Sequence, residues 1–105
     1  MKLVPLRIPG AFRIDVEPLE DERGFFARTF CQEELRRHGV EFPVAQCSLS
    51  FNREAFTLRG MHVQAAPCPE QKIVRCTAGR VWDCLLDLRP ASPAFKQWAA
   101  EELSA

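Results

Sequence analysis

The sequence predicts an all-β fold with one short helix, and three observations support this. In most segments apolar residues recur at every second position, as in a strand with one buried face. Phe12, Ile14 and Val16, for example, alternate with charged residues. Proline and glycine occur at short intervals, which is typical of strands joined by turns. Only the residues between Thr29 and Gly39 have the features of a helix.

The elements can be predicted in order along the chain. A strand at 12–16 is followed by an aromatic-rich extended segment at 24–30. The helix between Thr29 and Gly39 has glutamates early, arginines late and a glycine at its end, as dipole and C-cap preferences favour. The remaining predicted strands are 44–50, 57–64, 71–77, 80–88 and 95–103.

The strand at 80–88 is expected to pair with 71–77 as a hairpin, because Ala78 and Gly79 form a tight connection between them. Its side chains divide by alternation between two faces. One face carries Trp82, Cys84, Leu86 and Leu88, and the other carries Val81, Asp83, Leu85 and Asp87.

Length and charge limit the classes of protein. The chain has 105 residues, enough for one small domain, and its 14 basic residues balance its 14 acidic residues. This balance predicts neither nucleic acid nor a membrane as partner. No apolar run approaches the roughly 20 residues of a spanning helix, and no signal-peptide apolar region follows Met1. The five cysteines are odd in number and lack close pairing, so we expect reduced thiols in a cytoplasmic protein.

The candidate site centres on segments 58–64 and 71–74, which bring Arg59, His62 and Lys72 into apolar, strand-like sequence. Burying charged groups costs free energy, so three together predict a polar pocket lined by sheet. Arg59 and His62 are three residues apart, and a regular strand would send them to opposite faces. Either Gly60 marks a bulge, or Arg59 reaches round the open end of the sheet.

These residue types suit proton transfer and the binding of anions. A histidine titrates near working pH and is a natural base. A lysine can stabilise an oxygen on which negative charge develops. Arginines such as those at positions 23 and 59 can hold phosphate groups through paired donors.

Six motifs in one order make the chain resemble the dTDP-4-dehydrorhamnose 3,5-epimerase family, cupin-fold enzymes of dTDP-L-rhamnose synthesis. The resemblance runs from about Pro9 to the last residue. The motifs are Arg23-Gly24-Phe25-Phe26, Gln46-Cys47-Ser48-Leu49-Ser50, Leu58-Arg59-Gly60-Met61-His62-Val63-Gln64, Lys72-Ile73-Val74, Gly79-Arg80-Val81-Trp82-Asp83 and Asp87-Leu88-Arg89-Pro90-Ala91-Ser92-Pro93.

The resemblance implies a cupin jelly-roll barrel, a homodimer, and an isomerase that acts on a dTDP-4-keto-6-deoxy sugar without cofactor or metal. It implies that His62 removes a proton from the carbon next to the ketone and that Lys72 lies near the developing enolate. It also implies that Arg23 and Arg59 hold the diphosphate of the nucleotide. Asp83 lies between Val81 and Leu85, and we hypothesise that it orients one of these two groups. The residues expected to bind substrate are Arg23, Phe26, Arg28, Gln46, Ser48 and Arg59.

Each site residue also has a structural interpretation. A histidine in an apolar strand is commonly a hydrogen-bonded core residue, and a strand lysine commonly lies at a sheet edge with its amine in water. Arg23 follows three acidic residues and could form an exposed ion pair of small effect. A metal site is not expected, because Gln64 stands where a metal-binding cupin has its second histidine.

The chain departs from the family pattern in three places. The family commonly has a carboxylate at the position of Arg28 and an asparagine at the position of Ser48. The family enzymes also continue beyond this chain, and their second half supplies a tyrosine acid, whereas this chain has no tyrosine. We therefore expect residues 1–105 to form a single, C-terminally incomplete cupin domain, either a fragment or a degenerate gene product, with weak activity or none.

The alternative function is a non-catalytic cupin remnant that binds nucleotide sugars or a full-length partner. A plain β-sandwich interaction module is a third interpretation, and it predicts no dTDP binding. The sequence leaves open whether C3, C5 or both carbons are inverted.

Overall fold

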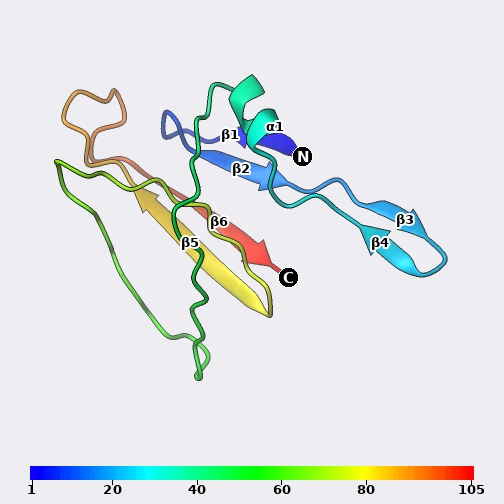
Figure 1. The fold of residues 1–105 in the computed structure, drawn as a ribbon. Helices are drawn as coiled ribbons and strands as arrows, with labels where there is room; N and C mark the ends of the chain where they lie inside the picture. The colour runs from blue at the N-terminus through cyan, green and yellow to red at the C-terminus, as the bar shows by residue number, and fades with distance from the viewer.

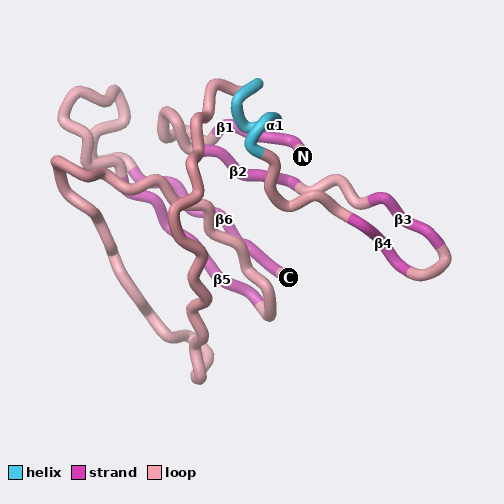
Figure 2. The backbone as a smooth tube through the Cα atoms, in the orientation of Figure 1, coloured by secondary structure: helices cyan, strands magenta, loops and turns pink.

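The computed structural model describes residues 1–105 and contains six strands and one helix (Figure 1). The strands form three separate antiparallel ribbons of two strands each, and the ribbons do not close into a barrel. Long connections without regular structure join the ribbons (Figure 2). The prediction of a mainly β chain with one short helix is confirmed.

The first ribbon joins β1 (Lys2–Pro5) to β2 (Phe12–Asp15). Leu3 lies opposite Ile14 and is one of the few buried residues. The predicted strand at 12–16 is confirmed except for its last residue. Its partner β1 was not predicted, because Leu3 and Val4 are adjacent in this short strand and do not alternate with polar residues.

The second ribbon is formed by β3 (Leu19–Asp21) and β4 (Gly24–Phe26), and it is called the arm below. The arm projects away from the other two ribbons (Figure 1). Gly24 has φ +131°, a conformation that favours glycine, at the turn between the two strands. Only the first three residues of the predicted extended segment 24–30 are a strand. Every residue of the arm is exposed.

The helix α1 (Gln32–Arg37) confirms the only predicted helix. Glu33 and Glu34 are in its first turn, where the helix dipole favours negative charge. The helix ends because Gly39 adopts φ +73° and its N–H donates to the Arg36 carbonyl at 2.9 Å. Leu35 is only 2% exposed, so it is the residue through which the helix packs against the rest of the molecule.

The third ribbon pairs β5 (Arg80–Leu86) with β6 (Trp98–Ser104). The predicted hairpin between 71–77 and 80–88 is therefore wrong. The predicted alternation of faces is confirmed in part, because the Trp82 ring makes an edge contact with Trp98 at 6.2 Å between centroids. The predicted strand at 95–103 begins three residues later, since Lys96 has φ +63° and belongs to the turn.

The turn between β5 and β6 explains why these two strands pair. The Asp87 N–H donates to the Gln97 carbonyl at 2.9 Å, and the Lys96 N–H donates to the Asp87 carbonyl at 2.8 Å. The buried Asp87 carboxylate accepts from the Arg89 backbone and guanidinium and from the Ser92 hydroxyl. A local network that begins at Asp87 thus reverses the chain, whereas the hairpin prediction rested on the turn at Ala78 and Gly79.

Residues 41–78 form no strand, so the predicted strands at 44–50, 57–64 and 71–77 are wrong for this chain. None of the 28 backbone–backbone hydrogen bonds involves these residues. A closed domain of this length has roughly 70 such bonds. An alternating sequence indicates which side chains favour burial. A β-strand also requires a neighbouring strand whose backbone forms hydrogen bonds with it.

The core is small and lies where the first and third ribbons meet. Its central cluster consists of Ile8, Ala94 and Ala99, with Ala11 packed against it. The radius of gyration is 15.4 Å, against about 13 Å for a compact domain of 100 residues. The single helix, at six residues, is too short to cross a membrane.

Candidate active site

Arg59 is held in place by two polar side chains from the segment before it. Its guanidinium donates to the Ser50 hydroxyl at 2.5 Å and to the Asn52 side-chain oxygen at 3.2 Å. These bonds tie Arg59 to residues 50–52 and leave its other N–H donors available. The sequence contained a signal for this arrangement, because Ser48, Ser50 and Asn52 recur at every second position.

His62 lies close to Gly60, two residues before it. Gly60 has φ +99°, and a Cβ atom added there would lie 3.4 Å from the His62 Nδ1 atom. That separation is close to an ordinary van der Waals contact, so the positive φ, rather than lack of space, is what favours glycine at position 60. Of the two alternatives for Arg59 and His62, a bulge at Gly60 is wrong, because no strand is formed at this position.

His62 is exposed, and this corrects the expectation of a pocket lined by sheet. The physical reason lies in the backbone. The segments 44–50, 57–64 and 71–77 do not pair, so they provide no wall around the imidazole.

Lys72 forms an ion pair with Glu70 at 2.5 Å, and its side chain is 52% exposed. The partner carboxylate is two residues earlier, on the same face of an extended chain. Glu70 was not among the predicted site residues, although its spacing from Lys72 would have marked it as a partner. An exposed pair of this kind contributes little to stability.

Asp83 lies in β5 opposite Glu101 of β6 and is half-buried. Two carboxylates directly opposite each other on a ribbon repel. Asp83 makes no ion pair with Lys72, whose partner is Glu70. Its role in orienting Lys72 or His62 stays a prediction.

Arg23 and Phe26 lie on the arm. The Arg23 guanidinium contacts the Asp21 carboxylate at 2.6 Å, and this hydrogen bond lowers the pKa of Asp21. Phe26 is 70% exposed. The arm extends to the opposite side of the molecule from the loop that carries Arg59 and His62 (Figure 1). A single copy of the chain therefore does not bring Arg23 and Phe26 close to Arg59 and His62.

The other predicted binding residues lie in connections. Gln46 and Ser48 are both exposed in the segment before Arg59. Arg28 follows the arm, and its guanidinium donates to the Glu34 carboxylate of α1 at 2.7 Å. This hydrogen bond raises the pKa of Arg28.

A hollow of about 450 Å³ lies elsewhere, between β1, β2 and β6. Arg7, Arg13 and Trp98 contribute to its lining, and none of the predicted site residues does. The Arg7 guanidinium lies 5.1 Å from the Trp98 ring centroid, within the range of a cation–π contact. No group of three or more His, Cys, Asp and Glu side chains suited to a metal is gathered in residues 1–105.

Comparison with known proteins gives the family. The family model for dTDP-4-dehydrorhamnose 3,5-epimerase matches residues 5–105. The enzymes of that name from Shigella flexneri and Pseudomonas aeruginosa are 37% and 39% identical over the whole chain. The chain spans 58% of the length of each of these two relatives.

Solved structures agree with the family model. The crystal structure of the Bacillus anthracis enzyme of the same name, with TDP and PPi bound, matches 99% of the chain with a TM-score of 0.93 and 34% identity. The chain covers 59% of that structure. The Elizabethkingia anophelis enzyme also matches with a TM-score of 0.93. The fold is thus that of an epimerase, seen over part of its length, and the chain belongs to the dTDP-4-dehydrorhamnose 3,5-epimerase family.

Proposed function

We propose that this protein is a nucleotide-sugar epimerase that acts on a dTDP-4-keto-6-deoxy sugar. One observation carries the proposal. The backbone matches, at a TM-score of 0.93, an epimerase whose crystal structure contains TDP and PPi. That match includes the segments with His62, Lys72 and Arg59, because it covers 99% of the chain.

In the proposed reaction His62 is the base. Its neutral imidazole takes a proton from the carbon next to the ketone, and the electron pair of the C–H bond forms an enolate. Return of a proton to the other face inverts that carbon. The exposure of His62 supports this role, because a substrate can reach the ring.

Lys72 is the proposed group that stabilises the enolate oxygen. Its ammonium is paired with Glu70. For Lys72 to act, its ion pair with Glu70 has to be replaced by an ion pair with the enolate oxygen. Breaking the pair with Glu70 costs little free energy, because exposed ion pairs are weak. Asp83 is proposed to orient His62 or Lys72.

The diphosphate is proposed to bind Arg59 and Arg23, each of which has donors left to form paired hydrogen bonds. Phe26 offers an exposed ring for stacking. The remaining proposed contacts to the substrate come from Gln46, Ser48 and Arg28.

The proposed assembly is a homodimer in which the arm of one copy reaches the site of the other. The separation of the arm from Arg59 and His62 supports this assembly, because one chain alone holds only part of the proposed site (Figure 1). We also propose a cytoplasmic location, with neither nucleic acid nor a membrane as partner. The balanced charge of the chain supports the absence of those partners.

The test is uptake of deuterium from heavy water into dTDP-4-keto-6-deoxyglucose, followed by mass spectrometry. The wild-type chain is expected to catalyse slow exchange, in keeping with weak activity, and His62→Ala is expected to abolish it. His38→Ala is the matched control, because His38 is the only other histidine and lies at the end of α1. Exchange at the wild-type rate in His62→Ala would contradict the proposal.

A binding function is the alternative, and the composition favours it. The chain has no tyrosine, so the family's acid is not among these residues. Loss of a general acid typically lowers a rate by roughly 10²- to 10⁴-fold. Binding of dTDP without any deuterium exchange would identify the chain as a nucleotide-sugar binding module.

A further inference from the structure

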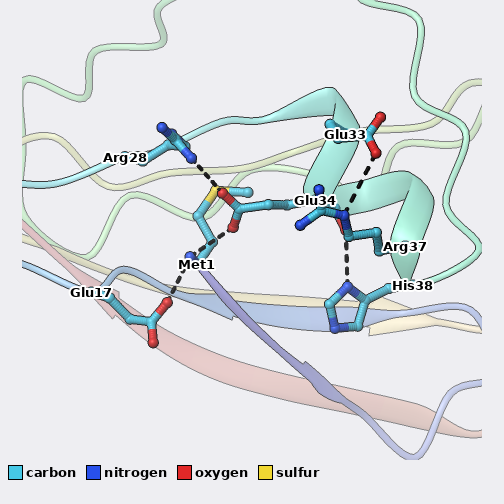
Figure 3. Close-up of polar contacts among 7 residues, drawn as sticks. All are labelled: Met1, Glu17, Arg28, Glu33, Glu34, Arg37 and His38. Carbon is cyan, nitrogen blue, oxygen red and sulfur yellow. Dashed lines mark hydrogen bonds and ion pairs between the residues drawn. The ribbon is translucent and has the colours of Figure 1, made fainter.

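A charge cluster lies at the base of the arm (Figure 3). The Glu34 carboxylate contacts the α-amino group of Met1 at 2.8 Å and the Arg28 guanidinium at 2.7 Å. The same α-amino group contacts the Glu17 carboxylate at 2.7 Å. Two carboxylates and two cations therefore form one continuous, electrically balanced network.

The cluster holds both ends of the arm. Glu17 comes two residues before β3, and Arg28 comes two residues after β4. Their partners belong to the rest of the molecule, since Met1 leads into β1 and Glu34 lies on α1. No backbone hydrogen bond links the arm to another ribbon. The ion pairs are the polar contacts that tie the base of the arm to the body.

Glu34 is the central member of the cluster. It bridges two cations, and its side chain is only 20% exposed, whereas that of Glu17 is 69% exposed. The α-amino group and Arg28 lower the pKa of Glu34 to about 2. A partly buried carboxylate with two cationic partners differs from an isolated surface pair, which would contribute almost nothing.

We propose that Glu34 is a positioning residue, which fixes the direction of the arm by holding Arg28 against α1. This inference rests on the proposed function, in which the arm presents Arg23 and Phe26 to the substrate. An arm held in one direction loses less conformational freedom on binding than one that swings. The cluster thus prepares the arm for a dTDP-linked ligand bound by a second copy of the chain.

The test compares Glu34→Gln with Glu33→Gln in the full chain. Glu33 is the matched control, because it is on the same helix and contacts only Arg36 and Arg37. In Glu34→Gln the ¹⁵N order parameters of Gly24 and Phe25 are expected to fall from about 0.85 to below about 0.6. The Kd for dTDP is expected to rise roughly tenfold. Glu33→Gln is expected to change neither quantity.

A control measurement and a second variant keep the outcomes distinct. The amide chemical shifts of β5 and β6 report whether each variant is folded. Arg28→Gln removes the Arg28–Glu34 ion pair from its other side, at a side chain that is 58% exposed. Unchanged order parameters of Gly24 and Phe25 in both Glu34→Gln and Arg28→Gln would overturn the inference. Failure of the wild-type chain to bind dTDP would contradict the proposed function, and the order parameters would still decide the role of Glu34.

Discussion

At Asp87 a single carboxylate organises the turn that joins β5 to β6. It is 3% exposed and accepts hydrogen bonds from Arg89 and Ser92, so its buried charge is fully paired. The motif at 87–93 was visible in the sequence, yet Asp87 was expected only as a residue on one face of a strand. Its role depends on contacts with later residues, and alternation along one strand does not contain that information.

Replacement of Asp87 tests this role at the scale of one residue. Asp87→Ala is expected to lower Tm by ~5 °C or more, because the Arg89 and Ser92 donors lose their acceptor. Asp83→Asn, in the same ribbon and without such partners, is expected to change Tm little. Thermal unfolding followed by circular dichroism measures both, and equal Tm values for the two variants would contradict the role.

The same carboxylate gives a pH dependence of stability. Hydrogen bonds from Arg89 and Ser92 lower the pKa of Asp87 in the folded chain. Its contribution is therefore complete above the unfolded pKa of about 4 and is lost as the pH falls below that value. When the pH is lowered through this range, Tm is expected to fall less in Asp87→Ala than in the wild-type chain.

The elements differ in how far local sequence determined them. The helix α1 was predicted because its charges, leucine and terminal glycine act within one short segment. The strand β5 was predicted from alternation, but its partner was not, because pairing was decided by the Asp87 turn. The site residues Arg59, His62 and Lys72 were selected by residue type, whereas their partners Ser50, Asn52 and Glu70 were missed. Enclosure of the site required strand pairing that residues 41–78 do not form.

Amide hydrogen exchange tests the difference between elements. Amides of β5 and β6 are expected to be protected, because they form a continuous antiparallel ladder. Amides of residues 41–78 are expected to exchange at nearly unprotected rates, since none donates to a backbone carbonyl. The measurement is exchange into heavy water followed by NMR. Slow exchange throughout 57–64 would show that this segment is a paired strand after all.

At the scale of the whole molecule, the sequence identified the family and the class of fold. The family model matches residues 5–105, a range that includes all six motifs, and the backbone matches the family's structures closely. The direction of the arm was not predicted. It depends on the Glu34 cluster and on the length of connections, neither of which appears as a periodic pattern.

Mixing two inactive variants tests the proposed exchange of arms in a dimer. Arg23→Ala removes an arm residue, and His62→Ala removes the base, so each homodimer is expected to be inactive in deuterium exchange. In a mixture that exchanges subunits, one site of a mixed dimer carries both intact residues. Activity of about a quarter of the wild-type value is expected from random pairing in a two-fold dimer. No recovery in a mixture shown to contain mixed dimers would contradict the shared site.

The hydrogen bond from the Arg89 guanidinium to the Pro9 carbonyl, at 2.7 Å, joins positions 80 residues apart. During synthesis on a ribosome, the amino-terminal hairpin emerges long before its guanidinium anchor does. The hairpin must therefore wait, unanchored at this point, until translation has passed Arg89. Nascent chains halted before that codon are expected to be cut by protease near Pro9, and those halted well after it are not.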